Sequence, residues 1–218
     1  MTSEIAFIDP AVAMYVAAHT TAPSEIEQRL IDETQSMAAA QMQIGFPQAR
    51  FMALLTRLLQ PTTVIEIGVF TGYSALVVAQ ELSDDATLIA CDISDEWTSI
   101  GKPYWEQAGV SDRIDLRIGR AALTLDALPP GTTVDLAFID ADKRGYQGYL
   151  EQLIPMMHER SVLLVDNVLW DGYVANPADQ SDDTVALRAF NDAVLADDRV
   201  DVALLPIGDG LSMITLTR

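Results

Sequence analysis

The chain has 218 residues, half of them hydrophobic, which is enough for one domain with a full core. Its 32 acidic and 13 basic residues give a formal net charge of −19, and such a surface repels nucleic-acid phosphates and anionic membranes. No nucleic-acid or membrane partner is therefore expected, and the single cysteine, Cys91, excludes an internal disulfide and is typical of a cytoplasmic protein.

The first part of the chain is predicted to be a helical extension over residues 1–60, ahead of an α/β core over residues 61–218. Three helices are expected in it, over residues 11–18, 23–40 and 47–59, from their apolar spacing and from helix-starting residue types. These helices suit a cover for a ligand crevice or an interface between two copies in a homodimer. The sequence alone does not decide between the two roles.

The stretch Val64–Ala79 predicts a strand, a tight glycine turn and a helix. Residues 64–67 form a short β-branched run, Gly68 and Gly72 bound the turn, and the residues from Tyr73 onward are apolar helix formers. A strand that enters a helix through a glycine turn brings bare backbone and a helix N-terminus up to a ligand. The spacing E-x-G-x-x-x-G differs from the G-x-G-x-x-G fingerprint of dinucleotide-binding proteins.

Asp92 is the second candidate for cofactor binding. It follows the apolar run 87–91 and should lie at the carboxyl end of the second strand. A carboxylate at that place can accept hydrogen bonds from both ribose hydroxyls of an adenosine-containing cofactor. Cys91, one residue earlier in the same run, is interpreted as a small buried hydrophobic residue rather than a nucleophile.

The alternation of strands and helices predicts a Rossmann-like α/β fold with a seven-stranded, mostly parallel sheet. The turn Gly208-Asp209-Gly210 is too short for a crossover helix, so the last strand should run antiparallel to its neighbour. The strands are expected near residues 64–68, 87–92, 114–118, 134–140, 161–166, 201–206 and 211–217.

Polar side chains follow two neighbouring strands of the predicted sheet. Asp140, Asp142 and Lys143 come after the fourth strand, and Asp166 and Asn167 come after the fifth. The carboxyl ends of parallel strands are where open α/β sheets bind ligands. The oxygens of Asp140, Asp166 and Asn167 suit Mg²⁺, Mn²⁺ or Ca²⁺ rather than zinc. The alternative is that these residues only cap turns at the strand ends.

Lys143 is one of only two lysines in the chain. It follows Asp140 by three residues, so a helical turn after the strand would place both side chains on one side. That arrangement would bring an amine to the predicted cation and suits a general base. The alternative is a surface lysine that neutralises the acidic residues around it.

Together these segments resemble the cation-dependent catechol-type O-methyltransferases, which include the caffeoyl-CoA O-methyltransferases of plants and smaller bacterial relatives. A six-stranded parallel core with a reversed seventh strand is typical of this methyltransferase class. The resemblance implies a single O-methyltransferase domain over residues 1–218, with S-adenosylmethionine as methyl donor and a divalent cation, usually Mg²⁺. The segments are EIGVFTGYSAL (66–76), ACDISDEW (90–97), PYWEQAGV (103–110), FIDADKRGY (138–146), VDNVLWDG (165–172) and LLPIGDGL (204–211).

The resemblance also assigns roles position by position. The residues implied to bind the donor are Met42, Ile44, Glu66, Gly68, Val69, Ser74, Asp92, Ala121, Asp140 and Asp142. The residues implied to hold the metal are Asp140, Asp166 and Asn167. Lys143 matches the family's general base.

The substrate side of the site carries Trp170, Asp171 and Tyr173, just past Asn167. The two aromatic residues suit a wall for an aromatic substrate or simple loop packing, and Asp171 stands where the plant enzymes carry an asparagine. The first 49 residues contain one basic residue, Arg29, so little is available to hold the phosphates of a CoA ester. A small free catechol is therefore the expected substrate.

Two other functions remain open for this sequence. One is a donor-binding regulatory protein without activity, although the metal and base residues are all present. The other is a nucleotide-dependent oxidoreductase, which the glycine spacing and the closing hairpin disfavour.

Overall fold

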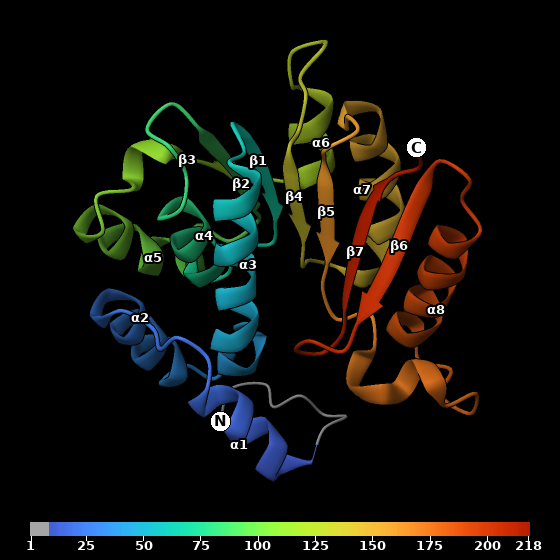
Figure 1. Ribbon diagram of the computed structural model, residues 1–218, viewed down its shortest axis with the longest axis horizontal. Coiled ribbons are helices and arrows are strands. Elements are labelled where there is room, and N and C mark those ends of the chain that lie inside the picture. The colour runs from blue at the N-terminus through green and yellow to red at the C-terminus, as the bar shows by residue number, and fades with distance from the viewer. Residues whose placement is uncertain (1–8) are drawn as a thin grey trace.

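The computed structural model describes residues 9–218, in which a seven-stranded sheet lies between two layers of helices (Figure 1). The strand order is β3-β2-β1-β4-β5-β7-β6, with parallel pairing from β3 to β5 and β7 antiparallel to both β5 and β6. The predicted fold class is confirmed, including the reversed seventh strand. The strands are β1 (Thr63–Ile67), β2 (Thr87–Asp92), β3 (Ile114–Ile118), β4 (Leu136–Ile139), β5 (Val162–Val165), β6 (Val200–Leu205) and β7 (Leu211–Leu216).

In the described part of the chain, one α-helix follows each of the first five strands, and three α-helices come before β1. The α-helices are α1 (Pro10–Ala18), α2 (Glu25–Gln35), α3 (Phe46–Leu59), α4 (Tyr73–Ala79), α5 (Asp95–Gln107), α6 (Ala121–Asp126), α7 (Tyr146–Leu153) and α8 (Asp182–Leu195). Short 3₁₀ helices are η1 (Ala40–Met42), η2 (Ser111–Arg113), η3 (Lys143–Gly145), η4 (Ile154–Met156) and η5 (Trp170–Ala175).

Helix α2 is shorter than predicted. It starts at a capping box, in which the Ser24 hydroxyl accepts from the Glu27 amide and the Glu27 carboxylate accepts from the Ser24 amide. It ends at Gln35 rather than near residue 40. The Ser36 hydroxyl donates to the Glu33 carbonyl at 2.6 Å, and such local bonds compete with continuation of the helix.

Both faces of the sheet are covered, because successive side chains of a strand point to opposite faces. Val64 joins a core cluster with residues of α2, α3, α4 and α5, whereas Ile65 and Ile67 join a second cluster with residues of α6, α7 and α8. Two-sided burial explains why the central strands are almost continuously apolar.

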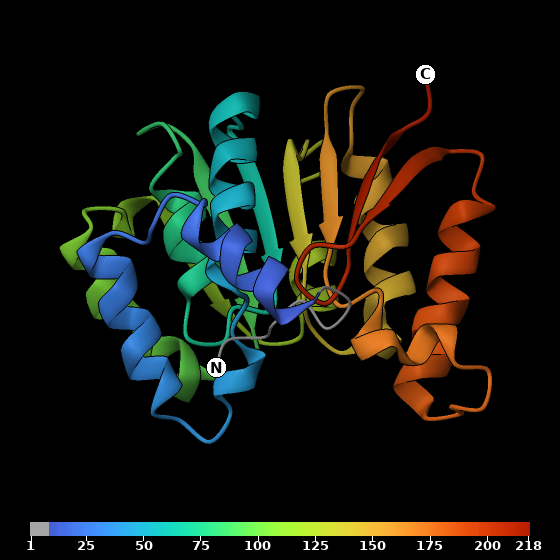
Figure 2. The same ribbon diagram turned by 60° about the horizontal axis from the view of Figure 1, so that its bottom comes forward.

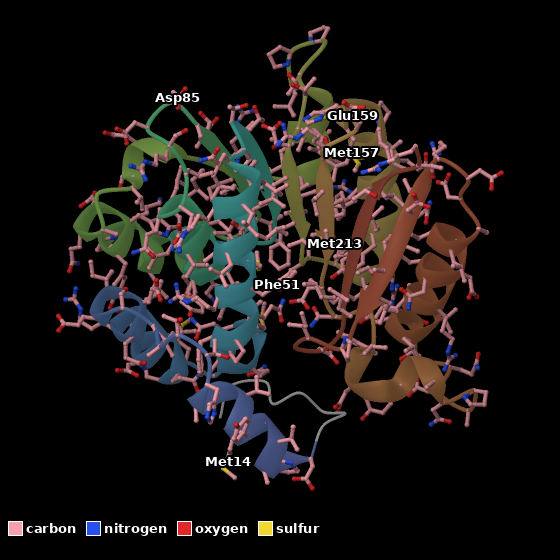
Figure 3. The ribbon with its side chains drawn as sticks, in the orientation of Figure 1. Met14, Phe51, Asp85, Met157, Glu159 and Met213 are labelled. Atoms are coloured by element: carbon pink, nitrogen blue, oxygen red, sulfur yellow. The ribbon has the colours of Figure 1, made fainter. Side chains whose placement is uncertain are left out.

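The helices before the sheet differ in how deeply they pack. On α3, Met52 and Ala53 are buried, and Figure 3 shows Phe51 of this helix and Met213 of β7 near the middle of the molecule, both packed against the first core cluster. Helix α1 has no buried residue, and its Met14 side chain points outward. Within residues 9–218, no helix has both the length and the apolar character that crossing a membrane requires.

The carboxyl ends of the parallel strands form one edge of the sheet. Figure 2 brings this edge toward the viewer, with α1, the β6–β7 turn and the segment after β5 around it. The Val168 amide donates to the Gly210 carbonyl at 3.1 Å, which ties the segment after β5 to the β6–β7 turn. This edge is where the candidate site residues gather.

Candidate active site

A cavity of about 1170 Å³ opens at the carboxyl edge of the sheet, where open α/β sheets bind ligands. Glu66 lies behind its wall, in contact with Ser74. Tyr173 is not among the lining residues, and 45% of its surface is exposed. The predicted site residues that do line the cavity are Met42, Ile44, Gly68, Val69, Ser74, Asp92, Ala121, Asp140, Asp142, Lys143, Asp166, Asn167, Trp170 and Asp171.

The glycine turn after β1 requires glycine at both of its ends. Gly68 has φ of 94°, and a Cβ there would lie 1.8 Å from the Asp140 carbonyl oxygen. Gly72 has φ of 83°, and a Cβ there would lie 2.4 Å from the Trp105 ring. Both positions combine left-handed backbone with close contact, which only glycine tolerates. The turn can therefore lie directly against the end of β4.

Asp92 holds this glycine turn in place. Its Oδ2 accepts from the amides of Val69 at 2.8 Å and Phe70 at 2.9 Å, and its Oδ1 accepts from the Ser94 amide at 2.8 Å. An ionised carboxylate has about four acceptor positions, so three amide bonds leave about one for a ligand. Cys91 beside it is buried as predicted, and burial raises the pKa of its thiol to about 11.

Glu66 is a buried acid beneath the glycine turn. Its Oε1 accepts a short hydrogen bond from the Ser74 hydroxyl of α4, and only 2% of the residue's surface is exposed. Burial raises the pKa of Glu66 to about 8. Repulsion from Asp140 and Asp92 is a smaller contribution in the same direction. We therefore expect this carboxyl to be largely protonated at neutral pH.

Lys143 lies at the centre of the polar groups after β4 and β5. Its Nζ donates to Asp140 Oδ1 at 3.1 Å, to Asn167 Oδ1 at 2.5 Å and to the Tyr146 hydroxyl at 2.7 Å. The Trp170 ring lies 5.6 Å from the same nitrogen, within range of a cation–π interaction. The three-residue spacing of Asp140 and Lys143 thus brings the two side chains together, as predicted.

Tyr146 is a site residue that the sequence reasoning missed. Its hydroxyl accepts from Lys143 and donates to the Asp166 carbonyl at 3.1 Å. Burial raises the pKa of Tyr146 well above its ordinary value, so the hydroxyl keeps its proton and this alignment. It begins α7 three residues after Lys143, and that helical spacing is the signal that could have identified it.

Gln48 is a second missed residue. Its Nε2 donates to Asp166 Oδ2 at 2.8 Å, and the Asn167 amide donates to Asp166 Oδ1 at 2.7 Å. A Cβ on Gly208 would lie 2.0 Å from Gln48 Oε1, so the β6–β7 turn closes tightly on this amide. Burial raises the pKa of Asp166 to about 7, and repulsion from Asp140 is a smaller contribution in the same direction.

Asp209, in the β6–β7 turn, fastens the segment that carries the predicted substrate residues. Its Oδ1 accepts from the Asp171 amide at 2.5 Å, its Oδ2 accepts from Asn167 Nδ2 at 3.4 Å, and its carbonyl accepts from the Leu169 amide at 3.0 Å. Asn167, Trp170 and Asp171 all have positive φ, between 48° and 58°. Non-glycine residues in this region persist where surrounding contacts hold them.

The predicted metal ligands offer oxygen atoms of the kind that a divalent cation such as Mg²⁺ prefers. Within residues 9–218, no group of three or more His, Cys, Asp or Glu side chains is arranged to hold a metal. The predicted set has two carboxylates and one amide oxygen, and Asp140 and Asn167 share the positive Lys143 Nζ between them. A buried Asp166 that is repelled by Asp140 gains from an added cation. The donor set therefore fits a hard cation, with Lys143 beside it.

A family model described as O-methyltransferase matches residues 17–217. The chain belongs to the O-methyltransferase family. The match includes all of the sheet and every residue that lines the cavity.

The curated relatives of this O-methyltransferase agree with that assignment. The probable caffeoyl-CoA O-methyltransferase 2 of Dictyostelium discoideum is 38% identical over 206 residues, covering 92% of this chain and 89% of that protein. The caffeoyl-CoA O-methyltransferase of Mesembryanthemum crystallinum is 36% identical over 215 residues, covering 93% of this chain and 85% of that protein. The similarity therefore extends over nearly the whole length of both relatives.

Solved structures share the fold of this O-methyltransferase. The SAH-bound Podospora anserina methyltransferase PaMTH1 superposes with a TM-score of 0.87 at 26% identity, covering 95% of this chain and 94% of that chain. A putative O-methyltransferase from Klebsiella pneumoniae gives a TM-score of 0.85 at 27% identity, covering 95% and 97%. Both alignments leave only about a twentieth of this chain uncovered.

Asp92→Ala is expected to destabilise the O-methyltransferase even without ligand. The substitution removes the acceptor of three backbone amides, and we expect a loss of about 2–4 kcal/mol in the free energy of unfolding. Urea denaturation measures this loss. Asp95→Ala is the control, because Asp95 is an exposed acid whose carboxylate pairs with the Lys102 side chain at 3.0 Å. Equal stability of the two variants would contradict the role of Asp92 in holding the turn.

The raised pKa of Glu66 predicts a pH-dependent stability. Between its ordinary pKa of 4.5 and its folded value of about 8, the folded state holds a proton that the unfolded state has lost. The free energy of unfolding should therefore fall as pH rises through this window, by at most about 1.4 kcal/mol per pH unit. Below and above the window the contribution of Glu66 is constant.

Glu66→Gln isolates this contribution, because glutamine has nearly the same shape and does not titrate. Urea denaturation of the variant at several pH values should show a shallower fall in stability than the wild type. Asp166 acts in the same direction up to about pH 7, so some slope should remain in both proteins. Identical slopes in the two proteins would contradict a raised pKa for Glu66.

Proposed function

We propose that this O-methyltransferase transfers a methyl group from S-adenosylmethionine to a hydroxyl of a small catechol, with a divalent cation at Asp140, Asp166 and Asn167. The observation that carries the proposal is the contact of Lys143 Nζ with Asp140 and Asn167 at the wall of a large cavity. An amine beside oxygen ligands suits removal of a phenol proton next to a chelating cation.

The cavity has room for a donor and an acceptor together. Its volume of about 1170 Å³ exceeds the roughly 300–1,000 Å³ of typical small-molecule sites. The donor would supply an electrophilic methyl group on a sulfonium. Asp92 and the glycine turn suit its adenosine part, since they lie at the ends of β2 and β1. The relatives' names and the SAH bound to the Podospora structure support this choice of donor.

Asp140, Asp166 and Asn167 would hold the cation. Mg²⁺ is the first choice, with Mn²⁺ or Ca²⁺ as alternatives, because all three ligands are hard oxygens. The cation would supply Lewis-acid activation of a phenol oxygen. The Gln48 side chain donates to one oxygen of the Asp166 carboxylate and the Asn167 backbone amide donates to the other, which keeps the carboxylate oriented.

Lys143 is proposed as the general base. In this structure its Nζ lies within hydrogen-bond distance of Asp140, Asn167 and the Tyr146 hydroxyl. As a neutral amine it would accept the proton of the attacking hydroxyl. The Tyr146 hydroxyl keeps Nζ at the end of β4, and the rate gain would come from alignment and preorganised charge.

The charge of the cavity wall supports a small acceptor without phosphate groups. Besides the predicted ligands, the wall includes the carboxylates of Asp142, Asp171, Asp183 and Asp209. Arg120 and Arg144 also line it, and the Arg144 guanidinium pairs with Asp182 at 2.5 Å, so the carboxylates of the wall outnumber its cationic groups. Such a wall repels the phosphates of a CoA ester, so we favour a free catechol as the acceptor.

A methyl-transfer screen tests the proposal. The purified enzyme is incubated with S-adenosylmethionine and a set of catechols, with Mg²⁺, without it, and with a chelator. We expect a methylated product that requires both the catechol and the cation. Binding of SAH without turnover of any catechol would indicate a regulatory protein instead. Tight binding of NAD in place of SAH would indicate an oxidoreductase.

A further inference from the structure

Arg188 of α8 binds four backbone carbonyls of the segment that follows the predicted substrate residues. Its Nε donates to the Val174 carbonyl at 2.9 Å, and its Nη1 donates to the Asp179 carbonyl at 2.8 Å. Its Nη2 donates to the Tyr173 carbonyl at 2.9 Å and also to the Asn176 carbonyl. A guanidinium carries five N–H donors in a rigid plane, so this one side chain can join carbonyls spread over residues 173–179. These residues form the clamped segment.

The clamped segment has few other contacts that fix its position. Residues 176–179 belong to no helix or strand, and in the described chain their other hydrogen bonds join near neighbours, such as the Ala178 amide and the Asn176 side chain at 3.1 Å. The Val174 side chain, near the start of the segment, packs against the second core cluster. Bonds between near neighbours shape a turn but do not place it on the rest of the molecule. Arg188 therefore supplies the hydrogen bonds that hold the segment to α8.

The cavity wall lies immediately before the clamped segment. Trp170 and Asp171 line the cavity and have φ of 48° and 50°, in the left-handed region. The Asp171 amide donates to Asp209 at 2.5 Å, and the Tyr173 carbonyl that binds Arg188 lies two residues further along the chain. Non-glycine residues keep such a backbone only where the surrounding structure holds them. Asp209 and Arg188 therefore hold this wall from its two sides.

Helix α8 also contacts η3, the turn that carries Lys143. Asp182, at the start of α8, pairs with Arg144 of η3 at 2.5 Å. The Trp170 ring lies 5.6 Å from Lys143 Nζ, across the same side of the site. One helix is thus bonded to the turn of the proposed base and to the segment behind the proposed acceptor wall, so it can set the spacing between them.

We propose that Arg188 is a positioning residue for the acceptor, which holds the clamped segment so that Trp170 and Asp171 form a fixed wall. The inference rests on the proposed catechol acceptor and adds a residue from outside the site to that function. Arg188 is not among the described residues that line the cavity, so it acts through the segment. Asp92 and the glycine turn contact each other at the ends of β2 and β1, so donor binding should not depend on Arg188.

Arg188→Leu should raise the KM for the catechol about fivefold or more, because a displaced wall no longer fits the acceptor. The affinity for S-adenosylhomocysteine, measured by calorimetry, should stay within about twofold of the wild type. A general loss of the fold would not separate these two quantities. Arg188→Lys should restore the KM only in part, since an ammonium has three donors and no planar fork. The lysine variant carries the test if the leucine variant does not fold.

Limited proteolysis with chymotrypsin tests the clamp without any turnover. This protease cleaves after aromatic residues, and Tyr173, at the start of the clamped segment, is 45% exposed. Cleavage after Tyr173 should be at least about fivefold faster in Arg188→Leu than in the wild type, because the segment opens more often. Mass spectrometry of the fragments identifies the cleaved bond.

Arg199→Leu is the matched control. Arg199 also makes several hydrogen bonds, but its partners are the carboxylates of Asp197 and Glu151, and none of these three residues lines the cavity. The catechol KM and the cleavage rate after Tyr173 should both stay within about twofold of the wild type, since exposed ion pairs contribute little.

Two kinds of result would overturn the inference. A loss of S-adenosylhomocysteine affinity equal to the rise in the catechol KM would mean that Arg188 supports the fold as a whole. An unchanged KM, or unchanged cleavage after Tyr173, would mean that the segment keeps its place without Arg188. Absence of catechol turnover by the wild type would contradict the proposed function instead, and the cleavage rates would still decide whether Arg188 holds the segment.

Discussion

Lys143→Ala should lower kcat by roughly 10²–10⁴-fold, the usual loss when a general base is removed. Affinity for S-adenosylhomocysteine should change little, because Asp92 and the glycine turn lie at other strand ends. Lys143→Arg should restore little activity, since a guanidinium keeps its proton at any working pH. Steady-state kinetics with the catechol found in the screen measures both variants.

Lys102→Ala is the matched control for this prediction. Lys102 is the only other lysine of the chain, and its side chain is 44% exposed and pairs with Asp95. Its removal should leave kcat within about twofold, since exposed ion pairs contribute little. If Lys143→Ala kept a near-normal kcat from about pH 6 to about pH 9, the base would have to be another group.

Removal of divalent cations should abolish turnover, and Mg²⁺ or Mn²⁺ should restore it. The expectation follows from the oxygen-only ligand set and from the buried Asp166 carboxylate, whose pKa is raised by burial and by Asp140. Asp166→Ala should remove activity as well, while S-adenosylhomocysteine binding is largely retained. Kinetics after chelation, with each cation added back, measures the first effect.

Calorimetry with Mg²⁺ alone provides a readout that does not depend on turnover. The wild type should bind the cation, and Asp166→Ala should bind it at least about tenfold more weakly, as loss of one of three protein ligands implies. Asp84→Ala is the control, because this acid is almost fully exposed and pairs with Arg113 far from the cavity lining. Full activity of a metal-stripped sample would contradict the proposed cation.

Much of the fold was predictable from local pattern. The predicted strands 87–92 and 114–118 have the observed bounds of β2 and β3, because runs of buried residues between turn residues carry a strong local signal. The Gly208-Asp209-Gly210 turn predicted an antiparallel last strand, because it is too short to contain the crossover helix that a parallel neighbour needs. The bounds of α2 were less predictable, since one Ser36 hydroxyl bond coincides with its end.

The sequence by itself determined which polar residues would meet. Asp92, Asp140 and Asp166 each end a strand of a parallel sheet, and parallel strands end at one edge, so their convergence follows from topology. The three-residue spacing of Asp140 and Lys143 likewise predicted that their side chains would meet, because a helical turn brings such residues to one side. None of this required knowledge of contacts between distant segments.

Only the tertiary structure decided which side chains complete the site. Gln48 lies 118 positions before Asp166 in the chain, and Asp209 lies 42 positions after Asn167, yet each contacts its partner. Such pairs have no periodic signal, because they depend on how α3 and the β6–β7 turn pack onto the sheet. That the Gln43 amide is buried without a hydrogen-bond partner among residues 9–218 also became visible only in three dimensions, since local sequence does not specify burial of a polar side chain.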